Sequence, residues 1–470
     1  MKILFLCTAH NSLSQRLFIA LAETHTISIE YALSDTTMVE AATLFQPHFI
    51  ICPFLTARVP QEIYQQFLTL IVHPGPPGDV GSSALDWLLV GDDGSETDPE
   101  NLLITQPLSD LGRQYWGVTV LQAIEEFDAG PVWAFEQFPV DINDLHLTKS
   151  TLYRGPVTRA AVIATLAAVE RIRARLLEMA PLSDLESQLS PKMAGLTISL
   201  HISPSSTYRD YSVTEKKPFQ GGTTRHRPLL KAAQRDFDIS LHTAKEISRR
   251  IRCSDSQPGC LSTVLGNNLY LYGGIVEEGQ WIQEMDVVAG ALIGCRDEAV
   301  CIAICDKKGV WITHLRRVKG KQDTTLWPKV PAVTCLRDIQ LLSIERVKQL
   351  TVPQPTKDWS MANLSTFQEI WVEFTTVAEE QRVAYVFFEF YNRVMSSTQC
   401  ARLVQTLEFV LPKHTDLEPL SAVVLMGGAS YFSNGIDLNV IETADDCDKC
   451  AGSENAVVQP AMFQRQTYHR

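Results

Sequence analysis

Hydrophobic segments alternate with amphipathic ones over the first third of the chain. Lys2 to Cys7 is an almost uninterrupted apolar run, which is typical of a strand buried on both faces of a sheet. A helical pattern follows over Gln15 to Leu21, with Asn11 or Ser12 placed to cap it. Because such alternation continues, the pattern predicts a mostly parallel, doubly wound sheet. The further apolar strands are expected at Ile27 to Ala32, Phe49 to Cys52 and Leu68 to Val72.

The segment from Gly91 to Asp110 is acidic and turn-rich, and we expect it to be a surface insertion. A long helix with an apolar stripe is predicted over Val157 to Met179, and Pro181 ends it. Residues 1–182 should therefore form one Rossmann-like α/β domain, with a linker over 183–214.

The pattern changes after this linker to short strands separated by turns. Residues 215–350 are expected to form a small β-rich, OB-like barrel domain, interrupted by a helix over Thr243 to Arg252. A second linker is predicted at 351–366, then an α/β segment at 367–442 and an unstructured tail at 443–470. The α/β segment should contain strands at Ile370 to Phe374, Val383 to Phe390 and Val423 to Met426, and a helix over Thr398 to Phe409.

The chain has 470 residues and a formal net charge of −13, which argues against a general nucleic-acid binder. Basic residues nevertheless gather in one stretch. This cluster is either a solvated helix face or a site for a polyanion such as RNA. Its members are Arg225, Arg227, Lys231, Arg235, Lys245, Arg249, Arg250 and Arg252.

The cysteines and the apolar runs bear on location. Eleven cysteines do not form a disulfide framework in a chain of this size, and several lie in buried-strand patterns, as expected in a reducing compartment. No run is long enough to span a membrane, so we expect a cytoplasmic protein. Cys447 and Cys450 have a metal-ligand spacing but no second pair nearby, and no metal site is predicted.

Two glycine-rich loops carry the candidate chemistry. One follows the fourth apolar run and extends from His73 to Asp86; the other is Phe127 to Pro131, around Asp128. Groups that transfer protons often lie on loops that are positioned by a rigid sheet. Glycine, proline and aspartate are also common in ordinary turns, so the two loops could instead be structural. No Gly-x-Gly-x-x-Gly and no P-loop follows the first strand.

Residues 1 to about 180 resemble the formyltetrahydrofolate-dependent formyltransferase and hydrolase superfamily. The motifs are His73-Pro74-Gly75, Gly117-Val118-Thr119 and Asp128-Ala129-Gly130-Pro131, in that order. The β-rich segment, with Arg227 to Lys231 and Pro258 to Cys260, is similar to the C-terminal domain of the same superfamily.

A narrower resemblance is to hydrogenase-maturation factors of the HypX type, in which a formyltransferase module precedes a crotonase module. It implies an enzyme that moves the formyl group from 10-formyltetrahydrofolate to coenzyme A. The resulting formyl-coenzyme A is then decarbonylated to give carbon monoxide. Coenzyme A is thus a candidate acceptor. The stretches that carry the resemblance are Asn11 to Arg16, Cys52 to Leu55, His73 to Trp87, Tyr153 to Thr158 and Gly427 to Glu442.

The resemblance implies that His73 is the proton donor near the formyl group and that Asp128 orients it. The superfamily places an Asn two residues before this His, where the chain has Ile71, which can donate nothing. That difference removes one donor for the oxyanion. The spacing of 55 residues from His73 to Asp128 is long for the superfamily, and the Gly91 to Asp110 insertion accounts for it.

Two groups of residues are expected to bind the folate cofactor. Pro53, Phe54 and Leu55 lie after the third strand, where backbone groups of the superfamily meet the pterin, although Phe54 could equally be core packing. The second group lies at the N-terminus of the first predicted helix and on a later loop, where an anionic ligand could bind. These residues could instead be an ordinary helix cap with solvated side chains. The second group comprises Asn11, Ser12, Gln15, Arg16 and Arg154.

The crotonase-like segment resembles only the opening of that fold. Gly435 and the amide of Ile436 match the loop that meets a thioester oxygen, but the segments that would complete the site do not follow, so the crotonase step is expected to be lost through truncation. Two alternatives remain open. One is a methionyl-tRNA formyltransferase that uses the basic cluster, and the other is a non-catalytic remnant that binds folate or a partner.

Overall fold

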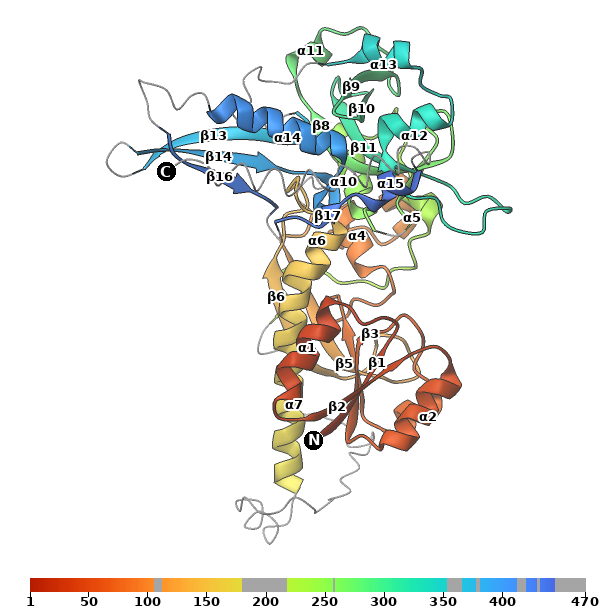
Figure 1. Cartoon of the computed structure of the whole chain (residues 1–470). Helices are drawn as coiled ribbons and strands as arrows, with labels where there is room; N and C mark the ends of the chain where they lie inside the picture. The colour runs from red at the N-terminus through yellow and green to blue at the C-terminus, as the bar shows by residue number, and fades with distance from the viewer. Residues whose placement is uncertain are drawn as a thin grey trace. The chain divides into compact units, whose positions relative to one another are not determined.

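The computed structural model describes residues 1–104, 112–179, 218–256, 258–352, 366–377, 381–411, 420–428 and 432–443. Two compact units divide the chain, Met1–Gln234 and Arg235–Arg470, and each is described by itself (Figure 1). The linker predicted at 183–214 lies outside the described residues. So do most of the linker at 351–366, the tail after Thr443, and Cys447 and Cys450.

The first unit is built on a sheet of six strands. They are β1 (Lys2–Cys7), β2 (Thr26–Tyr31), β3 (Phe49–Phe54), β4 (Thr69–His73), β5 (Tyr115–Gln122) and β6 (Val132–Pro139). Their order is β2-β1-β3-β4-β5-β6, with the first four parallel and the last two antiparallel. The predicted Rossmann-like sheet is confirmed, and the apolar runs of β1, β3 and β4 are buried, whereas β2 at the end of the strand order is only half-buried.

Helices cover both faces of this sheet (Figure 1), with α1 and α7 side by side and α2 opposite them. The long predicted helix is α7, which packs against β5 and β6 through small residues such as Ala161, Ala164 and Ala168. The predicted insertion contains a short helix, α5, and its residues 105–110 lie outside the described ones. The helices are α1 (Ser12–Ala22), α2 (Asp35–Phe45), α3 (Gln61–Gln66), α4 (Ala84–Val90), α5 (Pro99–Ile104), α6 (Lys149–Leu152), the π-helical turn η1 (Tyr153–Val157) and α7 (Thr158–Met179).

Residues 218–231 form a strap that belongs to the first unit. Because of this strap, the first unit extends to Gln234, past the boundary expected at residue 182. The amide of Arg227 donates to the carbonyl of Val80 at 2.9 Å, and the indole of Trp87 donates to Pro228 at 2.8 Å. The hydroxyl of Thr224 donates to Pro77 at 3.1 Å. The strap therefore holds the loop that follows β4.

A buried ion pair fixes the strap. The guanidinium of Arg227 donates to both carboxylate oxygens of Asp92, at 2.6 and 2.9 Å, and Arg227 is 2% exposed. Arg113 donates to the carbonyls of Asp92 and Gly221, at 2.9 and 2.6 Å. Buried charges are tolerated when they are paired in this way, so these contacts tie the strap to the segment after α4.

The β-rich part of the second unit is an antiparallel sheet in the region predicted for the barrel domain. Its ladder runs β7-β8-β11-β10-β9, with β12 paired to β11. The elements are β7 (Cys260–Ser262), β8 (Leu269–Glu277), β9 (Leu292–Arg296), β10 (Ala299–Ala303), β11 (Gly309–Arg317), β12 (Val330–Pro331), α10 (Ala244–Cys253), α11 (Gln280–Gln283), α12 (Ala332–Asp338) and α13 (Ile344–Leu350).

The predicted α/β segment forms a small sheet of its own in the second unit. β13 pairs antiparallel with β14, and β16 pairs parallel with β14, while α14 packs on this sheet. Two short parallel strands, β15 and β17, precede α14 and α15 respectively. The bounds are β13 (Ile370–Val377), β14 (Gln381–Phe388), β15 (Val394–Met395), α14 (Ser397–Val410), β16 (Leu420–Met426), β17 (Gly435–Ile436) and α15 (Leu438–Thr443).

The basic cluster does not form a charged surface. Arg249, Arg250 and Arg252 on α10 are each at most 6% exposed, and Arg227 and Arg235 are also buried. Both readings of the cluster, as a solvated helix face and as a polyanion site, are therefore wrong. Arg250, for example, donates instead to the internal carbonyl of Asp236 at 2.7 Å.

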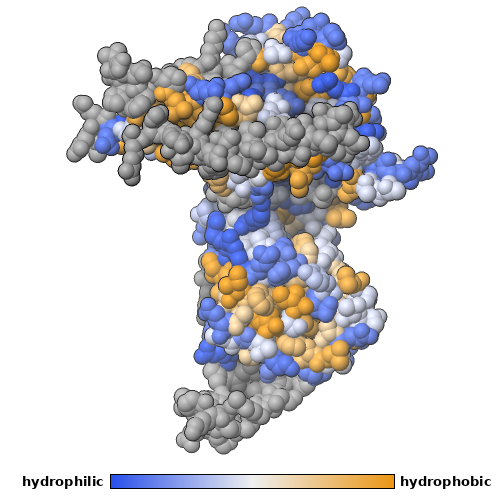
Figure 2. Space-filling view, in the orientation of Figure 1, coloured by the Kyte–Doolittle hydropathy of each residue, from blue (hydrophilic) through white to orange (hydrophobic). Residues whose placement is uncertain are grey.

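The surface of the first unit mixes hydrophilic and hydrophobic residues in the view of Figure 2. Within the described parts of the chain, no helix combines the length and the apolar character that crossing a bilayer requires.

We expect Arg227→Met to destabilise the first unit by about 3–5 kcal/mol, because it leaves the buried carboxylate of Asp92 without its cation. Equilibrium urea denaturation followed by tryptophan fluorescence measures the loss. Arg173→Met is the matched control, since Arg173 pairs with Glu170 on the exposed face of α7 at 3.4 Å. It should cost less than about 1 kcal/mol. Equal losses in the two variants would contradict a structural role for the buried pair.

Candidate functional site

His73 is the last residue of β4, at the edge of the sheet where the parallel strands end. It pairs with Thr119 on β5 and is 4% exposed. Because side chains alternate along a strand, His73 and Ile71 lie on the same face. The carboxyl edge of a parallel sheet is where α/β proteins generally bind ligands, so β4 delivers the imidazole to that edge.

The loop after β4 supplies a carboxylate that the sequence analysis did not single out. The Nε2 atom of His73 lies 2.9 Å from Oδ2 of Asp79, which is also buried. Gly75 makes room for this contact, since a Cβ there would lie 2.4 Å from each of the two atoms. The available signal was an acidic residue six positions after the histidine in a loop otherwise made of glycine, proline and valine.

The loop between β5 and β6, Ala123 to Pro131, brings the second carboxylate. The Nδ1 atom of His73 lies 3.5 Å from Oδ2 of Asp128, which also accepts the Gly81 amide at 3.4 Å. Asp128 adopts a left-handed backbone with φ of 51°, a conformation that aspartate tolerates better than most residues. The two residues predicted from sequence are thus brought together, 55 positions apart in the chain.

The two carboxylates decide the protonation of the imidazole. Burial by itself lowers the pKa of His73, but the hydrogen bond to Asp79 and the negative charges of Asp128 and Asp79 outweigh it and raise the pKa above its ordinary value of 6.5. The two carboxylates, one facing each ring nitrogen, therefore favour the imidazolium over the neutral ring.

A pocket of about 50 Å³ lies beside this group, on the face of β4 that carries Ile71. Asp128 is the acidic residue that both lines the pocket and faces His73. Arg58 also lines the pocket, and its guanidinium donates to the Glu125 carbonyl at 2.6 Å. The apolar side chains that line it are Leu55, Ala57, Val59, Ile71, Leu121, Ala123, Ile124 and Phe127.

The residues predicted to bind a cofactor divide into two groups. Leu55 lines the pocket, whereas Pro53 is buried in β3. Asn11 caps α1, its side chain accepting from the amides of Leu13 and Ser14 at 3.1 and 3.2 Å. The ordinary-cap reading of Asn11 therefore has direct structural support.

Tyr153 was missed, and it connects two of the predicted residues. Its hydroxyl accepts from the side-chain amide of Asn11 at 3.0 Å, and its ring meets Phe54 edge-on with centroids 6.0 Å apart. Burial raises the pKa of Tyr153 to about 12, so the hydroxyl stays protonated. The remaining predicted residues are half-buried or exposed: Ser12, Gln15 and Arg16 on α1, and Arg154 on η1.

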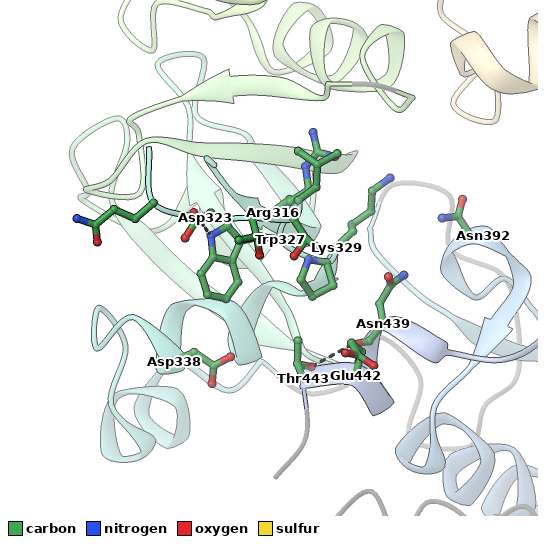
Figure 3. A pocket seen from close by; sticks show the side chains of 14 residues that line it. Arg316, Asp323, Trp327, Lys329, Asp338, Asn392, Asn439, Glu442 and Thr443 are labelled. Atoms are coloured by element: carbon green, nitrogen blue, oxygen red, sulfur yellow. Dashed lines mark hydrogen bonds between the residues drawn. The ribbon is translucent and has the colours of Figure 1, made fainter. Parts of the chain in front are cut away.

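A separate cleft lies within the second unit, beside the crotonase-like segment (Figure 3). Lys329 forms part of its wall, and its amine donates to the hydroxyl of Tyr391 at 2.9 Å. Burial lowers the pKa of Lys329 to about 8. Asn439, Glu442 and Thr443 of α15 line the same cleft. Gly435, with φ of 86°, and Ile436 come immediately before that helix.

The arrangement in the first unit is suited to proton transfer. A buried imidazolium with a carboxylate at each nitrogen, next to an apolar pocket, can stabilise a developing negative charge and can deliver a proton to a leaving group. The site is closed, because His73 has little exposed surface.

The family model for the C-terminal domain of formyl transferases matches residues 231–326. This range contains α10 and the strands β7 to β11 of the second unit. The match agrees with the superfamily expected from the motifs of the first unit.

Similar proteins cover nearly the whole chain. The hydrogenase maturation factor HoxX of Bradyrhizobium diazoefficiens is 28% identical over 449 residues, which are 95% of this chain and 62% of that protein. The crystal structure of HypX from Aquifex aeolicus in complex with tetrahydrofolic acid is 32% identical, with a TM-score of 0.66, and the match covers 95% of this chain and 63% of that one. A variant of the same protein matches equally well. The resemblance to HypX-type factors is confirmed, and the chain spans just over three fifths of these relatives' length.

We expect His73 to titrate with a pKa above 6.5 when histidine resonances are followed by NMR between pH 5 and 9. Asp128→Asn should lower this pKa, because it removes one of the two negative charges that favour the imidazolium. Asn tolerates the left-handed backbone of position 128, so the loop is preserved. A wild-type pKa below 6.5 would mean that burial outweighs the carboxylates and would contradict the electrostatics given above.

Proposed function

We propose that the first unit transfers or releases the formyl group of 10-formyltetrahydrofolate, in the manner expected of a HypX-like one-carbon enzyme. The observation that carries the proposal is His73, set between Asp79 and Asp128 beside an apolar pocket at the carboxyl edge of the sheet. Support comes from the relative of known structure that binds tetrahydrofolic acid and matches 95% of this chain.

The chemistry follows from where the protons can go. An acceptor, written X–H, attacks the formyl carbon, so that a C–X bond forms and the bond from carbon to N10 of the folate breaks. The Nδ1–H proton of His73 moves to N10. The proton of X–H passes to Asp128, which lies beside Nδ1 and returns it. With water as X–H the product is formate, and with a thiol it is a formyl thioester.

The pterin ring is expected to occupy the pocket lined by Leu55, Ile71 and Asp128. A water needs about 10–15 Å³ of such a cavity, so this pocket has room for only a few waters. Binding a two-ring system therefore requires the loop Ala123 to Pro131 to move outward, which also opens access to His73. Asn11, Ser12, Gln15, Arg16, Pro53, Phe54 and Arg154 stay part of this proposal as residues of the surrounding edge.

Coenzyme A as the acceptor belongs to the same proposal. The cleft in the second unit is lined by the cations Arg316 and Lys329 and by α15, which follows Gly435 and Ile436 in the chain. The amide of Ile436 would meet a thioester oxygen. A cytoplasmic location fits the nine cysteines of the described residues, all of which are unpaired thiols.

We expect wild-type protein to release tetrahydrofolate from 10-formyltetrahydrofolate and His73→Gln to be slower by about 100-fold or more, because the variant lacks the proton donor. The assay follows tetrahydrofolate by chromatography, with and without coenzyme A. Asp98→Asn, at an exposed carboxylate, is the control and should keep the wild-type rate.

Other outcomes point to the alternatives. Turnover that depends on charged initiator tRNA would indicate a methionyl-tRNA formyltransferase. Tight binding of the folate without turnover would contradict an enzyme and indicate a binding remnant.

We expect Ile71→Trp to weaken the binding of tetrahydrofolate by about tenfold or more, which corresponds to 1.4 kcal/mol, because the indole fills the pocket. Isothermal titration calorimetry measures the dissociation constant. Ile163→Trp is the control, since Ile163 is exposed on α7. Unchanged affinity in the pocket variant would place the folate elsewhere.

A further inference from the structure

His73 meets its two carboxylates unequally. The Nε2–Asp79 distance of 2.9 Å is that of a hydrogen bond, whereas the Nδ1–Asp128 distance of 3.5 Å is too long for one. Asp79 is also the less exposed of the two side chains. The ring is therefore anchored through Nε2, and Nδ1 is the nitrogen turned toward Asp128 and the pocket side.

The loop that carries Asp79 is held on both sides. Before it, the indole of Trp116 donates to the carbonyl of Pro74 at 2.9 Å, and the hydroxyl of Thr119 donates to Gly75 at 2.8 Å. After it, the strap donates to Val80 through the amide of Arg227 at 2.9 Å. The carboxylate is thus fixed in place by contacts from β5 and from residues more than 140 positions away.

The strand position two residues before His73 offers no hydrogen-bond donor from its side chain. Ile71 precedes His73 by two residues on the same face, lines the pocket and has an aliphatic side chain. A carbonyl oxygen that gains negative charge there must be met by another group. An imidazolium can stabilise that negative charge, provided that the ring stays protonated at the pH of the reaction.

We propose that Asp79 is a positioning residue that keeps His73 an imidazolium, anchored at Nε2, so that the Nδ1–H side of the ring stabilises the charge on the formyl oxygen before it protonates N10. This role rests on the proposed function. The charged groups that bear on the imidazole are Asp79 on its own loop and Asp128 on the β5–β6 loop, and Arg113 in turn interacts with the charge of Asp79.

The test uses Asp79→Asn, which keeps a hydrogen-bond acceptor in place and removes only the charge. By NMR titration of the full chain, the pKa of His73 should fall by about 1 to 2 relative to wild type. Because the imidazolium is the active form, activity is lost as pH rises through this pKa. The alkaline limb of single-turnover formyl release should therefore move to lower pH by the same amount.

The expected signature is a rate that depends on pH. At pH 5.5 the variant should come within about threefold of wild type, and at pH 8 it should be slower by about tenfold or more, as a pKa change of one unit implies. Asp98→Asn, which removes an exposed charge in the same unit, should change neither the His73 pKa nor the profile.

Gly75→Ala is the second variant, because its Cβ would occupy the space of the contact between His73 and Asp79 while both residues remain. It should move the His73 pKa in the same direction as Asp79→Asn. A loss of rate that is equal at every pH, with an unchanged His73 pKa, would overturn the role of Asp79. Absence of turnover in wild type would instead overturn the proposed function.

Discussion

The first unit depends on the pairing of charges that its fold removes from water. An isolated imidazolium at a position as buried as His73 would lose its proton, because burial disfavours the charged form. Two carboxylates, one from each loop beside β4, reverse that preference. A charged ring in an apolar site interacts strongly with charge that develops on a substrate. Because the ring is already oriented, no free energy is spent on reorienting it during the reaction.

The same constraint explains the strap. Residues 218–231 cross back to the first unit and pair Arg227 with Asp92, a second buried charge with its partner. Their backbone also holds the loop that presents Asp79. The strap thus links stability and chemistry, because the contacts that bury Arg227 also fix the carboxylate that orients His73.

Much of the fold could be predicted from the periodicity of apolar residues. The runs at Lys2 to Cys7 and Phe49 to Cys52 became buried parallel strands, since such runs have few other stable environments. The prediction for the basic cluster was wrong, because the positions of charged residues in a sequence do not show whether their side chains are exposed or buried. Arg249 and Arg250 are buried.

The site was predictable in part. His73 and Asp128 belong to motifs with a fixed order, and the fold brings them to 3.5 Å. Asp79 and Tyr153 were missed, since each acts through a contact that the local pattern does not encode. Asp79 reaches back across Gly75, and Tyr153 meets Asn11 from 142 positions away. Glycine in a turn suggests flexibility, whereas here its missing side chain makes room for a hydrogen bond.

The most direct test is a crystal structure of the chain with tetrahydrofolate bound. The account predicts the pterin in the pocket beside Ile71 and Asp128, with the loop Ala123 to Pro131 displaced outward. It also predicts N10 of the folate within about 3 Å of His73 Nδ1, the distance of a hydrogen bond. A folate bound at another surface, or one whose N10 faces away from the imidazole, would contradict it.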